Sequence, residues 1–410
     1  MISHEEVTSI AAEWSRQDGV RLGCECDPVV DEFDLGYVVW SKIPVDVPVA
    51  PGDGTLTVID RETGEMTHWP RLPSPVVQDL YRQDRAGRPP RVRTVDPAVE
   101  LRRAGRRSPT PGAAAHLSLG TEQYVARGAK GDLELRHHPL VAAYLADLPT
   151  GHLVRGGERH AELIVLSDVL HEYDRRQTSL RQPTLTLPVA RELLATAQFA
   201  LFRVRESGDP FGGPADRPCE SCLRALVHFG VLPWSDLAYA EESRPGPQPL
   251  PEADRFPPEV GFALVEAGWR PQFGDDLLAR NAVAAVTETP GGRHRHTSFP
   301  AVESALTRFP GLVSARRGPG EQVWIRRFDL DPRAAAYTAD SLGDFGALIR
   351  ARLFPIGTEQ GDSILAMDEY ERVFALDQAG EWFIGSGIDD ALTNLLLGRA
   401  AHRVRDDGSW

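Results

Sequence analysis

The chain has 410 residues, of which 41% are hydrophobic and 25% charged, so we expect a globular protein of two or three domains. The net charge of −14 argues against broad nonspecific binding to duplex DNA, because such binders are usually basic at least locally. No apolar run approaches the length that crosses a bilayer, so no membrane-spanning segment is expected.

The start of the chain lacks the basic and then apolar pattern of a secretory signal. Ser3 followed by Glu6 instead predicts a helix capping box. We therefore expect a cytoplasmic protein, with signal-independent export left open. Four cysteines in a chain of this length are too few for a disulfide framework.

Residues 1–82 are predicted to form a small α+β domain with a β-hairpin. The expected elements are a helix at 5–17, strands at 33–40, 55–60 and 66–69, and a helix at 75–82. The second strand ends in a turn made by Asp60, Arg61, Thr63 and Gly64. An aromatic strand followed by this turn resembles the small YrhB-like immunity domains, and the resemblance implies a binding role.

Residues 83–112 have the composition of a linker, rich in arginine, proline and glycine. A brief helix is possible at 99–101. One interpretation is an electrostatic tether for nucleic acid. The interpretation as a solvated, mobile connector is favoured, because no aromatic residues are interleaved with the arginines.

Residues 113–240 alternate helices and strands, which predicts a central layered α/β/α domain. Strands are expected at 133–137 and 198–205, and helices at 139–148, 158–176, 187–195 and from 218 to 229. Pro218 suits the first turn of the last helix, and Gly230 its end.

This domain contains His160-Ala161-Glu162 and, further on, Pro218-Cys219-Glu220-Ser221-Cys222. Together they complete the H-x-E…P-C-x-x-C signature of zinc-dependent nucleobase deaminases. His160, Cys219 and Cys222 would supply three zinc ligands and leave the fourth position open for water, as in catalytic zinc sites. Glu162 is the expected proton carrier. Cys219 and Cys222 lie one turn apart at a helix start, so both thiolates can face one point.

A closed structural zinc site is the alternative, and it would need a fourth ligand such as His152, His171 or His228. Two complete motif halves in the expected order favour the catalytic site. Cys24 and Cys26 could be ligands of a second metal, but buried or unpaired thiols are the favoured interpretation.

The residues from His160 to Leu163, from Leu166 to Asp168 and from Pro218 to Cys222 resemble the YwqJ-related deaminases of bacterial polymorphic toxin systems. The resemblance covers about 133–234. It implies a cytidine-deaminase-like fold, zinc held by His160, Cys219 and Cys222, a proton shuttle at Glu162, and a substrate that contains a nucleobase.

Residues 241–258 are predicted to form a second, proline-rich linker. Residues 259–399 are predicted to form a second α+β domain, and residues 400–410 are expected to be a frayed tail. The expected elements are helices at 259–267, 301–309 and 388–398 and strands at 321–328, 363–366 and 373–376. This domain resembles the third subgroup of the SUKH immunity superfamily. The motifs that carry the resemblance are Ala267-Gly268-Trp269, Phe309-Pro310-Gly311-Leu312, Phe328 to Pro332, Leu353 to Gly357, and Ala391 to Gly398. Arg270-Pro271-Gln272 and the turn from Asp368 to Val373, which lacks glycine, depart from the subgroup. The resemblance implies a toxin or immunity protein as partner, and no catalytic group stands out.

Two hypotheses follow. The first is a zinc-dependent deaminase, with a cytosine-type base favoured, and it is supported by the presence of all four chemical residues. The second is an immunity or binding protein whose deaminase-like core is a silent scaffold, and it is supported by the acidic charge and the two flanking domains. A zinc-stabilised structural protein is a third hypothesis. The base, the choice between free nucleotide and polynucleotide, and the oligomeric state stay open.

Overall fold

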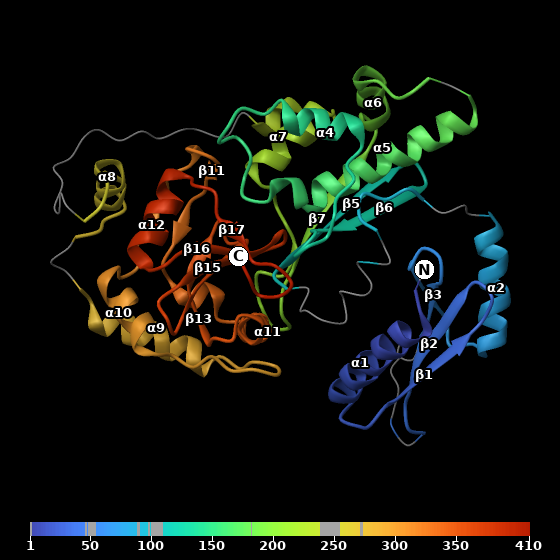
Figure 1. Cartoon of the computed structure of the whole chain (residues 1–410), viewed down its shortest axis with the longest axis horizontal. Helices are drawn as coiled ribbons and strands as arrows, with labels where there is room; N and C mark the ends of the chain where they lie inside the picture. The colour runs from blue at the N-terminus through green and yellow to red at the C-terminus, as the bar shows by residue number, and fades with distance from the viewer. Residues whose placement is uncertain are drawn as a thin grey trace. The chain divides into compact units, whose positions relative to one another are not determined.

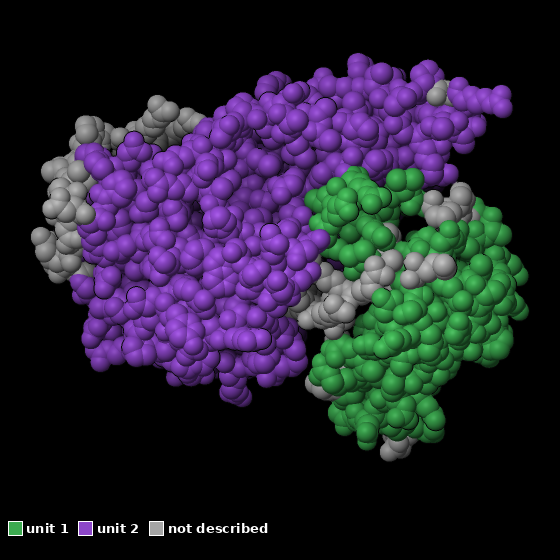
Figure 2. Space-filling model, viewed as in Figure 1, with its two compact units in different colours: residues 1–107, 133–136 green, residues 108–132, 137–410 purple. Residues whose placement is uncertain are grey.

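The computed structural model describes residues 2–45, 47, 55–87, 91–96, 99, 110–181, 183–237, 255–270 and 274–410. The chain is a multidomain protein of mixed helix and sheet, and it divides into two compact units (Figure 2). Unit 1 comprises 1–107 with 133–136, and unit 2 comprises 108–132 with 137–410. Half of the linker predicted at 83–112, most of the one predicted at 241–258, and all but the first residue of the brief helix expected at 99–101 lie outside the described residues. No helix in the described part of the chain has the length and apolar character needed to span a membrane.

Unit 1 contains a four-stranded antiparallel sheet in the order β1-β2-β3-β4, made by Asp27–Glu32, Gly36–Lys42, Leu56–Asp60 and Met66–Trp69. Helices α1 (His4–Leu22) and α2 (Ser74–Gly87) cover its two faces. Successive residues of β2 serve both cores, because side chains alternate along a strand. Tyr37 and Val39 join the core under α1, and Val38 joins the core under α2.

Local sequence signals shape unit 1 as predicted. Ser3 and Glu6 form the expected capping box at the start of α1. The predicted turn after β3 is held by Asp60, whose Oδ1 accepts from the backbone N–H of Glu62 and of Thr63. The other oxygen of Asp60 accepts from Tyr81 and Arg85 of α2, so this turn is fastened to the helix.

The first part of unit 2 has a four-stranded antiparallel sheet in the order β6-β5-β7-β8, made by Glu122–Arg127, Gly112–Leu119, Gln198–Val204 and Gly213–Pro214. Helix α5 (Ala161–Ser179) packs on β5 and β6 (Figure 1). Helices α4 (Pro139–Ala146) and α7 (Glu220–His228) pack on α5, and α6 is Leu187–Leu194. The predicted apolar stripe of α5 explains this arrangement, since Leu163, Leu166 and Leu170 are fully buried.

Two expectations for this region are wrong. The strand predicted at 133–137 is reduced to one bridge between Leu135 and Val95. The helix predicted from Glu158 begins only at Ala161, because Gly157–Arg159 form a separate 3₁₀ turn, η1.

The second part of unit 2 contains a seven-stranded antiparallel sheet in the order β17-β16-β15-β14-β13-β12-β9. Its strands are His402–Arg403, Gly380–Gly385, Val373–Asp377, Ser363–Asp368, Leu353–Glu359, Phe328–Asp329 and Val313–Ser314. A short ribbon pairs β10 (Gly318–Pro319) with β11 (Trp324–Ile325). One face carries α8 (Pro258–Glu266), α9 (Asp276–Glu288), α10 (Pro300–Arg308) and α12 (Ile388–Leu397), and the other carries α11 (Ala339–Ile349). The alternation in β14 again feeds two cores, with Leu365 on the first face and Ile364 on the second.

The expectation of a frayed tail at 400–410 is wrong. His402–Arg403 adds strand β17 to the edge strand β16, and Val404 is fully buried. Trp410 stacks on Phe383 with 5.4 Å between the ring centroids. The polar composition hid this strand because only Val404 and Trp410 supply apolar contacts.

We predict that Val404→Ala lowers the free energy of unfolding by about 2 kcal/mol, since it removes buried methyl groups and leaves a cavity. Urea unfolding followed by tryptophan fluorescence measures the change. His402→Ala is the control, because this side chain is exposed on the same strand. Equal midpoints for Val404→Ala and the wild type would mean that the tail is not part of the folded domain.

Candidate metal centre and active site

The start of α5 positions His160 and Glu162. His160 is the residue that caps the helix, in extended conformation, and it directly follows the turn η1. Glu162 lies in the first turn of α5 and is 0% exposed. The change from turn to helix at His160 therefore directs the imidazole and the carboxyl group into the same buried space.

The start of α7 positions the two cysteines. Cys219 caps this helix in extended conformation, and Cys222 lies in its first turn. The backbone N–H groups at a helix start, together with the helix dipole, favour thiolate over thiol. Two helices that are far apart in sequence thus present their N-terminal ends to one point.

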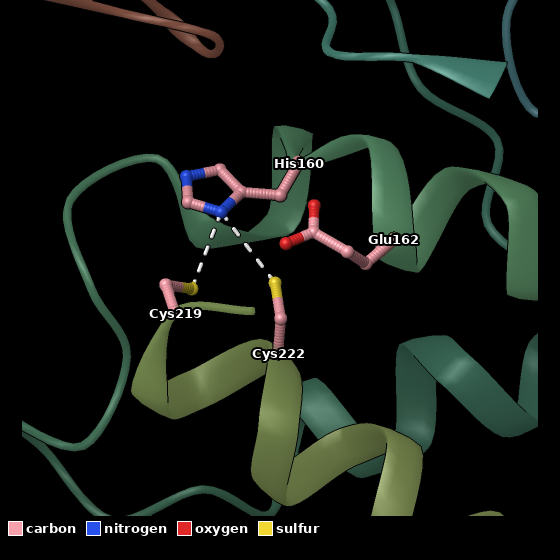
Figure 3. A group of neighbouring side chains, drawn as sticks. All are labelled: His160, Glu162, Cys219 and Cys222. Carbon is pink, nitrogen blue, oxygen red and sulfur yellow. Dashed lines mark hydrogen bonds between the residues drawn. The ribbon is translucent and has the colours of Figure 1, made fainter. Parts of the chain in front are cut away.

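The four predicted residues come together (Figure 3). Nδ1 of His160 lies 3.4 Å from Sγ of Cys219 and 3.5 Å from Sγ of Cys222. One donor atom from each of the four residues lies within 4.8 Å of the others. A tetrahedral zinc ion with ordinary Zn–N and Zn–S bonds separates its nitrogen and sulfur ligands by about 3.5 Å. The donor set and its spacing therefore fit a metal ion of this kind.

The residues considered as a fourth protein ligand lie elsewhere in the described structure. The ring of His228 packs against Tyr144 and Phe229, that of His171 against His138, and that of His152 near Trp324. None belongs to the group of four. The Sγ atoms of Cys24 and Cys26 are 3.6 Å apart in unit 1, and these half-buried cysteines are not joined by a disulfide.

Burial and mutual charge set the protonation of the metal-free group. Burial raises the pKa of Glu162 to about 7. Burial alone would lower the pKa of His160, but the neighbouring Cys219 thiolate raises it to about 9. Hydrogen bonding to Cys222 and the positive imidazole hold the pKa of Cys219 well below its usual value, whereas burial raises that of Cys222. At neutral pH the metal-free site holds protons on His160 and Cys222, and Glu162 is about half protonated.

Sequence reasoning missed Gln378, which reaches the site from the turn between β15 and β16. Its Oε1 accepts from the backbone N–H of Ala161 at 3.1 Å, and its Nε2 donates to Oε2 of Glu162 at 3.3 Å. The only local signal in this segment is turn chemistry, with Asp377 and Gly380 flanking the turn. Nothing in the sequence around Gln378 indicates a contact with α5.

A cavity of about 30 Å³ remains beside His160, Glu162 and Cys219. Arg203 of β7 and Arg205, which directly follows that strand, also line it. The second part of unit 2 closes it with Arg326, Asp362, Asp377 and Gln378. The walls of this site therefore come from both parts of unit 2.

A buried imidazole and two thiols beside a carboxyl group define the donor set of a deaminase-type metal site. Comparison with protein families agrees with this class. Residues 98–231 match the model of the YwqJ-like deaminase, residues 256–398 that of the SUKH-3 immunity protein, and residues 5–88 that of the Immunity protein 35-like domain. The predicted combination of a YwqJ-type deaminase with a SUKH domain and an N-terminal immunity-type domain is confirmed. Neither the curated proteins nor the solved structures gave a match.

We predict that zinc binding at pH 7 releases about two protons, from His160 and Cys222, because metal ligands must be deprotonated. The metal-free state holds more protons, so the affinity for zinc rises with pH. Calorimetric titration in buffers of different ionisation enthalpy counts the protons. The Cys222→Ser variant is expected to release one fewer, and the Cys24→Ser/Cys26→Ser double variant to match the wild type. Zinc binding without proton release would exclude His160 and Cys222 as the ligands.

Proposed function

We propose that residues 113–240 form a zinc-dependent hydrolytic deaminase of cytidine-deaminase-like, three-layered fold. Its substrate would be a nucleobase of cytosine type, in a nucleotide or a nucleic acid. The observation that carries the proposal is the convergence of His160, Glu162, Cys219 and Cys222 at spacings suited to zinc. The match to the YwqJ-like deaminase model over residues 98–231 also supports it.

His160, Cys219 and Cys222 would hold the zinc ion through one nitrogen and two sulfur atoms. When bound, zinc supplies the Lewis acidity that makes water a nucleophile at neutral pH. Three protein ligands leave a fourth position free, which distinguishes this set from a closed structural site.

Glu162 would move the protons. The oxygen of water adds to the amidine carbon of the base, the carbon–nitrogen bond breaks, and nitrogen leaves as ammonia while a carbonyl forms. Glu162 would take one proton from the water and deliver it to the ring nitrogen, and would then carry the second proton, from the new hydroxyl group, to the leaving amino group. A pKa of about 7, raised by burial, suits a group that must both accept and donate a proton near neutral pH.

Arg203 and Arg205 would bind the phosphate of the substrate. Arg203 lies in β7 and Arg205 directly follows the end of this strand, and both residues line the cavity. Guanidinium groups match phosphate oxygens in charge and geometry. A nucleotide or a strand of nucleic acid would supply such a group next to the base.

A second candidate function is binding of a toxin partner, as the immunity families imply. The observation that favours it is the narrow cavity of about 30 Å³, which the second part of unit 2 closes. In this case the protein would act through the domains that match SUKH-3 and Immunity protein 35-like models, with a silent deaminase core.

We predict that Glu162→Gln lowers ammonia release by about 10²–10⁴-fold while bound zinc is retained, because the variant keeps the ligands and loses the proton carrier. Ammonia is measured with cytidine, deoxycytidine and a cytosine-containing single-stranded oligonucleotide, and zinc by elemental analysis. The Glu162→Gln substitution is made both in the wild-type chain and in the Gln378→Ala variant, because Gln378 is hydrogen-bonded to Glu162.

The Glu192→Gln variant is the matched control, because Glu192 is exposed on α6. Cys219→Ala is expected to lose zinc. Stoichiometric zinc with no ammonia from any base, in either parent chain, would reject the enzyme in favour of the binding protein.

A further inference from the structure

We propose that the domain at 256–398 is a tethered inhibitor of the deaminase domain in the same chain. It docks on the face that carries the active site and holds Gln378 where the base of a substrate would lie. This inference rests on the proposed deaminase function and adds to it a partner and a mode of control.

The carboxamide of Gln378 imitates a nucleobase edge. It presents a carbonyl oxygen beside an amino group, which are the acceptor and donor that cytosine presents on one edge. The oxygen accepts a hydrogen bond from the backbone N–H of Ala161, and the amino group donates one to the carboxyl group of Glu162. An incoming base would need these same two partners, so it competes directly with Gln378.

The turn that carries Gln378 is rigid. The Oδ1 atom of Asp377 accepts from the backbone N–H groups of Ala379 and Gly380 and from the indole of Trp382. These bonds lie within the domain at 256–398, so they order the turn without help from the deaminase domain. Docking of Gln378 therefore costs little further conformational entropy.

The space left beside Gln378 is too small for a base. A cavity of about 30 Å³ has room for a water molecule or two. Typical small-molecule sites measure about 300–1,000 Å³. Entry of a nucleobase therefore requires the two domains to separate, or Gln378 to withdraw.

The docked domain also occupies Arg203 and Arg205. The Nε atom of Arg203 donates to the carboxylate of Asp362 at 2.7 Å. The guanidinium of Arg205 donates to the backbone carbonyls of Gly361 and Asp362. A carboxylate and two carbonyl oxygens thus take the donors that a phosphate would need.

Buried charges hold the domains together around this mimicry. Arg155 of the deaminase domain is buried, and it pairs with Glu359 and lies 3.6 Å from Asp377. Beyond the end of β7, Glu206 accepts from the backbone N–H and the hydroxyl of Ser341. Removal of one partner of the buried Arg155–Glu359 pair would leave the other charge buried and uncompensated, which is costly.

Gly128 shows that the deaminase domain is shaped for this partner. A Cβ atom added there would lie 2.4 Å from the backbone oxygen of Gln378. The backbone of Gly128 does not adopt a left-handed conformation, so its own fold does not demand glycine. The docked turn is the neighbour that requires a residue without a side chain.

The test measures how fast Cys219 and Cys222 react with a small thiol reagent in the zinc-free protein. A Cys24→Ser/Cys26→Ser background leaves these two thiols as the reactive pair, and intact mass counts the labels. Gln378→Ala removes the carboxamide, and Gly128→Val inserts a side chain against the docked turn. Gln123→Ala and Gly387→Ala are the matched controls, because Gln123 is exposed and a Cβ at Gly387 meets no atom within 4 Å.

We expect both test variants to label at least about tenfold faster than the wild type, because they raise the population of open molecules. The controls should label at the wild-type rate. In the zinc-loaded chains, ammonia release should rise in the same two variants. Unchanged labelling in both would overturn the inhibitor, and if Gly128→Val does not fold, Gln378→Ala alone decides.

The two proposals fail in different ways. Faster labelling without ammonia release from any base would reject the deaminase, and with it the inhibitory role. Ammonia release by the wild type at the rate of Gln378→Ala would keep the deaminase and reject the inhibitor.

Discussion

The site depends on the meeting of two helix N-terminal ends. The starts of α5 and α7 bring an imidazole within 3.5 Å of each of two thiols, which lie 59 and 62 residues further along the chain. Unpaired backbone N–H groups and the helix dipole make such ends suited to negative charge, so a thiolate is stable there even when buried. The packing of α5 on β5 and β6, and of α7 on α5, holds these two helix ends next to each other.

A buried group of this kind is sensitive to whatever covers it. The deaminase-type and SUKH-3-type domains belong to one compact unit, and their contact runs over the site itself. The cover is polar: Gln378 bonds to Ala161 and Glu162, and Asp362 pairs with Arg203. A molecule that displaces this polar cover must supply a hydrogen-bond partner for each polar group of the site, because any group without a partner would be left buried and unsatisfied. An apolar cover would impose no such requirement.

The sequence predicted the four site residues because each half of the signature is local: H-x-E and C-x-x-C owe their geometry to one helix start each. It predicted α5 and α7 from apolar periodicity and capping. It did not reveal β5, whose Ala113, Ala114 and Ala115 have low strand propensity and become a strand only through pairing with β6 and β7. It could not reveal Gln378, because Asp377 and Gly380 look like turn residues, and the contact with α5 spans 216 positions.

The deaminase-type domain and the SUKH-3-type domain that covers its site lie in one polypeptide, so the two domains are always present in a ratio of one to one. A separate toxin and antidote can fall out of balance whenever one is degraded or diluted faster than the other. Here each copy of residues 98–231 is synthesised together with residues 256–398. Linkage also makes docking intramolecular, with an effective concentration of roughly millimolar for short connections. Exposure of the site therefore responds to events that act on the interface, such as a competing partner or cleavage of the chain, and not to expression level.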